Sequence, residues 1–116
     1  MIKSVSLLFR NPSLSPEEFR AYWEDVHAPL VKKLLPGLIH YCGSFPVPGA
    51  DTSPHGEAID CDGIVELGWP DMATMNRDMA SPAFNTPERE ASSARLMDIS
   101  RTKVRIVEQV DVDLGG

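Results

Sequence analysis

The order of apolar and polar residues along the chain predicts a mixture of strands and helices. Period-two alternation and β-branched residues indicate strands at residues 2–9, 38–47, 60–69 and 99–112. A polar connection rich in proline and glycine, without periodicity, occupies residues 46–57. Helical spacing of apolar residues fills the intervals after the first and the third strand, so each of these intervals is predicted to be helical.

The first helical region begins with a capping signal at residues 15–18. Ser15 can accept a hydrogen bond from the free N–H groups of the first turn, and Pro16 suits the first helical position. Glu18 can complete a capping box with Ser15. Apolar residues then follow at helical spacing and form the predicted buried stripe: Phe19, Trp23, Val26 and Leu30.

Pro29 is predicted to interrupt this helix. Proline lacks a backbone N–H and disfavours helical geometry at the preceding Ala28, so we expect a kink or break there, followed by a short helical turn through Leu34. His27 lies one turn beyond Trp23, on the flank of the apolar stripe. Such a histidine faces neither open water nor a sealed core, and this is a useful place for a proton-transfer group.

The second helical region is predicted to start after Asp71, its capping residue, and to end near Met97 or Asp98. Ser81-Pro82 and Thr86-Pro87 repeat the cap-then-proline signal within it, so we expect two or three helical pieces. The element order is then β-α-β-β-α-β. This order predicts an α+β, ferredoxin-like fold, a four-stranded antiparallel sheet with its helices on one face.

Length and composition restrict the class of protein. The 116 residues suit one domain spanning residues 1–116. A formal charge of −6, from 11 basic and 17 acidic residues, argues against nucleic acid as a partner. No apolar run is long enough to span a membrane and no signal peptide precedes the first strand, so we expect a cytoplasmic protein. Two cysteines are too few for a disulfide framework, so both are expected to be free thiols.

The second face of the sheet predicts a partner. Two helical regions can cover only one face of four strands, and the other face carries Leu, Val and Ile among polar residues. A second copy of the chain is the simplest cover, so we expect a two-fold homodimer.

The residues of the first helix and of the third strand resemble those of the EthD family, which belongs to the dimeric α+β-barrel superfamily. The matching segments are residues 15–19, Tyr22-Trp23, residues 26–31, Pro36-Gly37-Leu38 with Tyr41, and residues 62–67. The resemblance spans nearly the whole chain, and its helical part is the more specific. It implies a homodimeric barrel with a pocket between helices and sheet in each subunit. It also implies a role in small-molecule metabolism, such as ether breakdown, muconolactone isomerisation or the decarboxylation and cyclisation of aromatic polyketides.

Two ionisable residues are the predicted catalytic groups. His27 titrates near neutral pH in its unperturbed state, so it could take up or release a proton, although it could instead bond a carbonyl freed at Pro29. Glu66 lies within the apolar segment 64–67, where burial without a partner would raise the pKa of its carboxyl group. It could orient His27 or act as an acid, or it could pair with a lysine or arginine at the surface or dimer interface.

Aromatic residues and one glycine are the predicted substrate-binding groups. Tyr22, Trp23 and Tyr41 could line an aromatic pocket, although the central place of Trp23 in the stripe also suits a core residue. The family often has an aromatic residue two positions after the glutamate. This chain has Gly68 there, followed by Trp69, and the missing side chain would change the space on the Glu66 face.

No metal or cofactor is predicted. His40, Cys42, His55 and Cys61 are metal-ligand types, but their spacing matches none of the usual close ligand pairs. Cys42 or Cys61 could instead act as a nucleophile or proton relay. Nucleotide-binding fingerprints are absent, and a haem would need His27 or His40 as its proximal ligand.

The leading hypothesis is a small cofactor-free enzyme in catabolism or polyketide-type metabolism, possessing a pocket histidine that transfers a proton on an aromatic or lactone-like metabolite. Isomerisation, cyclisation, decarboxylation and cofactor-free oxidation all fit this description. The alternatives are a non-catalytic binding protein that serves an oxygenase or degradation system, and a dimeric scaffold without a ligand.

Overall fold

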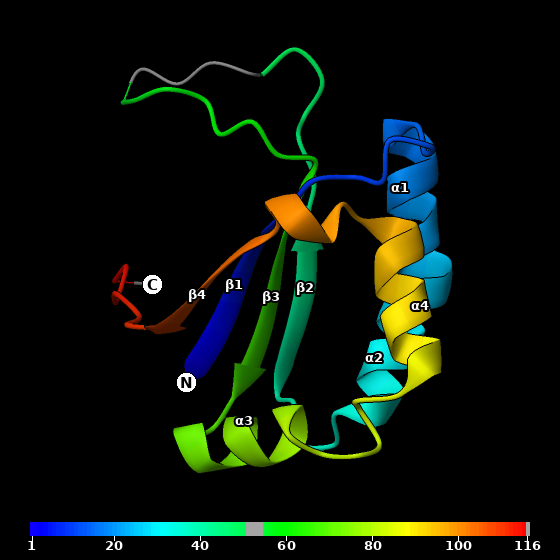
Figure 1. Cartoon of the computed structure of the whole chain (residues 1–116). Coiled ribbons are helices and arrows are strands. Elements are labelled where there is room, and N and C mark those ends of the chain that lie inside the picture. The colour runs from blue at the N-terminus through cyan, green and yellow to red at the C-terminus, as the bar shows by residue number, and fades with distance from the viewer. Residues whose placement is uncertain (51–54, 116) are drawn as a thin grey trace.

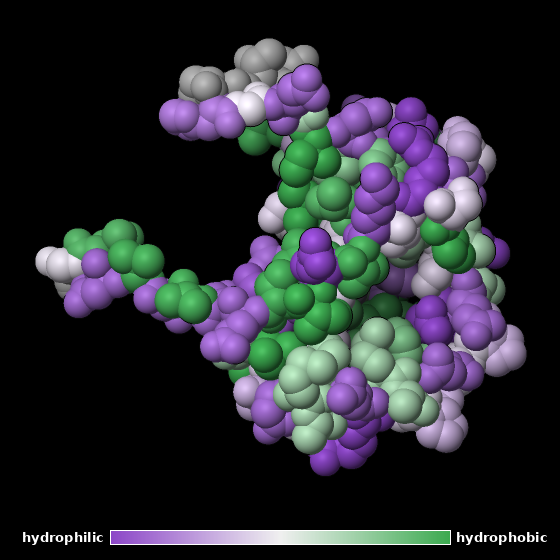
Figure 2. All heavy atoms as spheres, turned by 60° about the vertical axis from the view of Figure 1, so that its left-hand side comes forward, coloured by the Kyte–Doolittle hydropathy of each residue, from purple (hydrophilic) through white to green (hydrophobic). Residues whose placement is uncertain are grey.

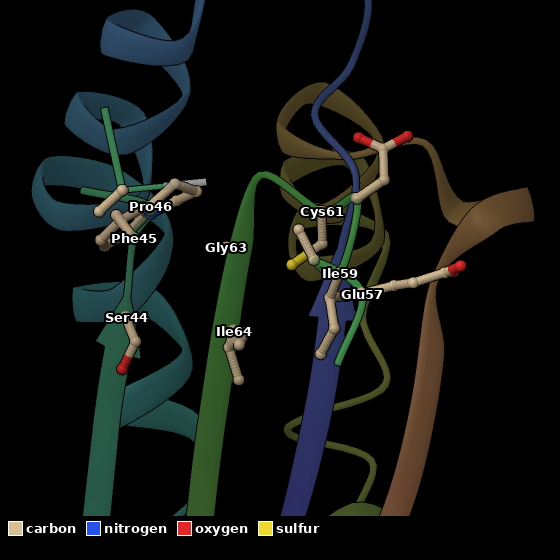
Figure 3. A pocket seen from close by; sticks show the side chains of 11 residues that line it. Ser44, Phe45, Pro46, Glu57, Ile59, Cys61, Gly63 and Ile64 are labelled. Carbon is tan, nitrogen blue, oxygen red and sulfur yellow. The ribbon is translucent and has the colours of Figure 1, made fainter. Parts of the chain in front are cut away.

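The computed structural model describes residues 1–50 and 55–115. The described residues form one antiparallel sheet with strand order β2-β3-β1-β4, and helices lie on one side of it (Figures 1 and 3). The strands are β1 (Ile2–Leu8), β2 (His40–Ser44), β3 (Gly63–Trp69) and β4 (Lys103–Glu108). The helices are α1 (Pro16–Tyr22), η1 (Trp23–His27), α2 (Ala28–Leu34), α3 (Met72–Met79), α4 (Pro87–Leu96) and η2 (Ile99–Arg101). The predicted ferredoxin-like arrangement is confirmed.

Local capping signals gave the correct helix starts. The Ser15 side chain accepts a hydrogen bond from the backbone of Glu18 at 3.1 Å, and the Glu18 side chain accepts one from the backbone of Ser15 at 2.9 Å. Asp71 accepts a hydrogen bond from the Thr74 backbone at 2.8 Å and caps α3. The second helical region is divided into α3 and α4, as its proline pairs predicted, and α4 ends at Leu96.

We predicted a kink or break at Ala28, and the chain does not break there. The chain instead passes through a π-helical turn, η1, and Ala28 keeps helical dihedral angles of −63° and −44°. The backbone N–H of Ala28 donates to the carbonyl of Trp23, five residues earlier. This wider turn moves carbonyl groups away from the ring of Pro29, which would clash with them in a regular α-helix.

The π-helical turn also shifts the buried stripe. We predicted Val26 and Leu30 at the core, but Val26 is 46% exposed, whereas His27 is 6% exposed and Val31 is 4% exposed. A turn with one additional residue delays every later position, so the buried face follows a spacing of four residues from Phe19 onwards. The turn therefore rotates His27 from the flank of the helix into its buried face.

Alternation along the strands sorts side chains between two faces. Val65, Leu67 and Trp69 of β3 face the helices, where they pack with Leu8 and Phe19 among others. The opposite face, which we call the open face, carries residues of all four strands. These are Lys3, Val5, Leu7, His40, Cys42, Ser44, Ile64, Glu66, Gly68, Lys103, Arg105 and Val107.

The strands are shorter than predicted. Residues 60–62 and 109–112 lie outside them, and residues 99–101 form η2. The β2–β3 register also differs from the one that would bring Cys61 opposite Cys42. Cys42 is paired with Glu66, because β3 begins only at Gly63.

Asp78 of α3 fastens the end of the sheet to the helices. Its Oδ2 atom accepts hydrogen bonds from the backbone of Gly37 at 2.8 Å and from Nε1 of the fully buried Trp69 at 2.9 Å. A Cβ atom at Gly37 would approach the Asp78 carboxylate to 2.7 Å and Thr74 to 2.4 Å. Only glycine fits this close crossing of α3 and the turn before β2.

Within residues 1–50 and 55–115, no helix combines the length and the apolar character that a membrane crossing requires.

Candidate functional site

His27 forms the centre of a buried polar group between helices. Its Nδ1 atom lies 2.9 Å from Oγ of Ser92, which belongs to α4. The same Ser92 oxygen lies 3.2 Å from the hydroxyl of Tyr22, at the end of α1. The structure thus brings together His27 and Tyr22, two of the residues predicted from the sequence, through a third that was not predicted.

Burial keeps the His27 imidazole neutral. Desolvation, assisted by the nearby positive charge of Arg89, lowers the pKa of His27 from 6.5 to about 4. At neutral pH the ring therefore carries one proton on one of its two nitrogens, and the other nitrogen has a free lone pair.

The Nε2 atom of His27 remains available to a ligand. It makes no hydrogen bond among the described residues. If Nδ1–H donates to the Ser92 oxygen, Nε2 holds the lone pair and can accept a proton.

The part of the sheet next to the helices leaves apolar surface uncovered. Val104 and Ile106 of β4 face the helix side of the sheet yet are 58% and 44% exposed. The buried hydroxyl residue Ser4 lies beside them on β1, paired with Ile106. Figure 2 shows apolar atoms gathered down the middle of the molecule, with a recess between them and the more polar atoms at the right of the view.

Glu66 does not meet His27. It lies on the open face of β3, whereas His27 is on the opposite side of the sheet, so the predicted orienting contact is not formed. Glu66 instead accepts a hydrogen bond from Lys3 and lies 3.4 Å from Nε2 of His40. The hydrogen bond from Lys3 lowers the pKa of the Glu66 carboxyl group. A raised pKa was expected only for an unpaired carboxylate, and the alternative, pairing with a lysine, is the one that the structure shows.

The aromatic residues form one cluster on the helix side. Trp23 makes edge-on contacts with Tyr41 and Phe45, with ring centroids 5.6 and 5.7 Å apart. Burial raises the pKa of Tyr41. A Cβ atom at Gly43 would come within 2.8 Å of the Trp23 ring, so the strand approaches the helix closely here. Trp23 and Tyr41 are both half-buried, and both pack against the core.

The other two predicted substrate-binding residues, Gly68 and Trp69, are tightly packed within the fold. Trp69 is fully buried and donates its indole N–H to Asp78, so the structure places it in the core. The missing side chain at Gly68 leaves no space, because a Cβ atom there would lie 2.7 Å from Sδ of Met1 and 2.8 Å from Cβ of His40. Trp69 and Gly68 thus support the fold at the end of β3.

A second hollow lies at the end of the sheet where β2 ends and β3 begins, away from Gly68 and Trp69 (Figure 3). Its volume is about 740 Å³, and its mostly apolar lining comes from the ends of β2 and β3 and from the connection between them. Cys61 lines it, and burial raises the pKa of this thiol. A reactive thiolate is therefore disfavoured there. Residues 51–54 of this connection lie outside the described part of the chain.

Comparison with known proteins identifies the family. The EthD domain matches residues 11–100, which is most of the chain. The protein belongs to the EthD family. No curated protein matches it.

Solved structures share the fold of this EthD domain. An EthD family protein from Bacillus halodurans is 23% identical with a TM-score of 0.61, and 95% of this chain and 100% of that chain are covered. An EthD-like protein from Ralstonia eutropha is 17% identical with a TM-score of 0.67 and coverages of 97% and 96%. SnoaB, a cofactor-independent oxygenase from Streptomyces nogalater, is 15% identical with a TM-score of 0.62 and coverages of 99% and 97%. At these identities the similarity establishes the fold.

Two residues of this EthD domain's polar group were missed in the sequence. Ser92 and Arg89 lie more than 60 positions from His27, within a helix whose small and polar residues gave no local signal. Their spacing of three residues places them on one face of α4, and that face packs on η1.

Proposed function

We propose that this EthD domain is a small cofactor-free enzyme that uses His27 to transfer a proton on an aromatic or lactone-like metabolite. The observation that carries this proposal is a neutral, buried imidazole whose Nδ1 contacts Ser92 and whose Nε2 has no partner among the described residues. The recess visible in Figure 2 would receive the substrate, and the exposed Val104 and Ile106 on the helix side of β4 would offer it apolar surface.

The chemistry follows from this arrangement. Ser92 Oγ accepts from Nδ1–H and fixes the tautomer, so that Nε2 removes a proton from a carbon or hydroxyl of the substrate. Tyr22 holds Ser92 in place through its own hydroxyl. A low-dielectric surrounding favours an uncharged ring before reaction, and the negative charge formed on the substrate then stabilises the imidazolium. Isomerisation, cyclisation and cofactor-free oxidation can all start with this step, whereas a decarboxylation would need the protonated ring to give a proton to the carbanion that loss of CO₂ leaves.

Changing His27 to alanine is expected to slow proton transfer by about 100-fold while ligand affinity changes little. The measurement is exchange of carbon-bound hydrogen with deuterium oxide in a panel of γ-lactones and polyphenolic polyketide analogues, followed by mass spectrometry. Binding of the same compounds is followed by quenching of tryptophan fluorescence. Ser92→Ala is expected to lower the exchange rate less than His27→Ala does and to shift the dependence of the rate on pH. The variant keeps the imidazole base but loses the hydrogen bond that selects its tautomer.

The scaffold and binding alternatives give different results. If the wild-type protein binds compounds of the panel but never exchanges their hydrogens faster than buffer does, the catalytic proposal is wrong and a binding role remains. The hollow of Figure 3 favours this second role, since its mostly apolar lining suits a hydrophobic ligand and it contains no part of the His27 group. Failure to bind any aromatic or lactone compound would support a scaffold.

We also propose that the open face mediates a two-fold homodimer. Val5, Leu7 and Ile64 put apolar side chains on this face, where the described chain places no helix. The segment after β4 extends away from the sheet with Val110 at 80% and Leu114 at 92% exposure (Figure 2). Such a segment gains apolar contacts when a second copy packs alongside.

Leu7→Asp is expected to weaken this dimer by about 100-fold, because two carboxylates would be buried in a two-fold interface. Sedimentation velocity across the micromolar range would measure the change. Val26→Asp is the matched control, since Val26 lies on the outer surface of η1 and should leave the dimer unchanged. A wild-type protein that stays monomeric at these concentrations would contradict the proposal.

A further inference from the structure

Three side chains of different types converge on the open face, on the side of the sheet opposite His27. His40 and Cys42 are two positions apart on β2, and therefore point to the same face, and Glu66 is the cross-strand partner of Cys42 on β3. One ligand atom from each of these residues can be chosen so that all three lie within 4.8 Å of one another. The proposed proton transfer uses none of them.

Two of the three distances between these atoms match the edges of a tetrahedral zinc site, and the third, from Cys42 to Glu66, is at most 4.8 Å. Bond lengths of about 2.3 Å for Zn–S and about 2.0–2.1 Å for Zn–N and Zn–O place sulfur and nitrogen roughly 3.5 Å apart, and nitrogen and oxygen roughly 3.3 Å apart. In the structure Cys42 Sγ lies 3.5 Å from His40 Nε2, and His40 Nε2 lies 3.4 Å from a carboxylate oxygen of Glu66. All three residues are half-buried, so an ion could enter from the open face.

We infer that His40, Cys42 and Glu66 bind a divalent zinc ion. A thiolate, an imidazole and a carboxylate form a mixed set of the borderline softness that Zn²⁺ prefers. Three protein ligands leave the fourth tetrahedral position to water. All three ligands come from one chain, so the site is complete in the monomer, whereas the dimer proposed above would cover the open face and close the entry of the ion.

The residue that opposes the ion is Lys3. Its ammonium group hydrogen-bonds to Glu66 on the same face and competes with a cation for the carboxylate. A cysteine binds Zn²⁺ as its thiolate, so Cys42 must lose its thiol proton when the ion binds. Binding of Zn²⁺ then forms a Zn–S bond and releases the thiol proton to solvent, so affinity rises with pH.

Cobalt provides a direct test. The purified full-length chain is kept reduced, freed of metal and titrated with Co²⁺, and we expect one ion per chain with an intense near-ultraviolet band from thiolate-to-cobalt charge transfer. Addition of Zn²⁺ should remove this band by displacement. Cys42→Ser should abolish the band and lower Zn²⁺ affinity by at least about 100-fold. Cys61→Ser, the matched control on the other cysteine, should leave both unchanged.

Two further variants test whether these side chains bind the ion or are neighbours by chance. Lys3→Met should tighten Zn²⁺ binding by roughly tenfold, because it removes a positive charge adjacent to the ion. His40→Ala should weaken binding while circular dichroism reports an intact fold. Absence of a thiolate band, a band that survives in Cys42→Ser, or Zn²⁺ affinity indifferent to both Cys42→Ser and His40→Ala would overturn the inference.

Discussion

Replacing Asp78 with alanine is expected to lower the free energy of unfolding by about 4 kcal/mol. The carboxylate is 3% exposed and accepts two hydrogen bonds, one from the Gly37 backbone and one from Trp69 Nε1. Truncation removes both and leaves the indole N–H of a fully buried tryptophan without an acceptor. The loss therefore combines two broken charge-assisted bonds with the cost of an unsatisfied buried donor.

Urea unfolding followed by tryptophan fluorescence would measure this change. Asp78→Asn is the control, because its amide oxygen can still accept from both donors, and it should lose roughly half as much stability as the alanine variant. Equal stability of the alanine variant and the wild-type protein would show that the three segments joined by Asp78 are held by packing alone.

Acid should destabilise the protein through His27 by about 3 kcal/mol in total. The folded-state pKa of His27 is about 4, below the ordinary value of 6.5, so the unfolded chain binds the proton more readily. The free energy of unfolding is therefore fully maintained above pH 6.5, and it decreases as the pH falls from there toward 4. At pH 5 the loss should already be about 2 kcal/mol.

The measurement is urea unfolding at pH 7 and pH 5 for wild type and His27→Asn. Asparagine can keep a hydrogen bond to Ser92 but does not titrate. The free energy of unfolding of His27→Asn should therefore fall less between pH 7 and pH 5 than that of wild type, by about 2 kcal/mol. Glu66 titrates below this range, since Lys3 lowers its pKa, and its contribution is lost only at more acidic pH. An equal loss of unfolding free energy between pH 7 and pH 5 in wild type and His27→Asn would contradict the burial of a neutral imidazole.

Features coded by neighbouring residues could be predicted from the sequence. The capping box of Ser15 and Glu18 and the Asp71 cap set helix starts through contacts three residues apart, so the sequence itself contains both partners. The order of strands and helices along the chain could be predicted because segments of alternating pattern and segments of helical spacing follow one another. His27 could be singled out as a candidate from its place near the apolar stripe and from the family resemblance.

The contacts of the site could not be predicted in the same way. Alternation showed that Glu66 shares a face with Gly68, but it could not tell which face the helices would cover, and the two faces lead to different partners for the carboxylate. The bond from His27 to Ser92 joins residues 65 positions apart. The stripe was misplaced by one residue beyond Trp23 because we assumed 3.6 residues per turn throughout, and the π-helical turn has no reliable local signal.

This turn has a consequence for how relatives should be aligned. A π-helical turn is geometrically a single-residue insertion in an α-helix, so a homologue with a regular helix would carry the matching imidazole three positions after its tryptophan rather than four. An ungapped alignment would then place His27 opposite a surface residue of that homologue. Apparent loss of the histidine in such a sequence would be an artefact of column assignment, and a one-residue gap between Trp23 and His27 would restore it.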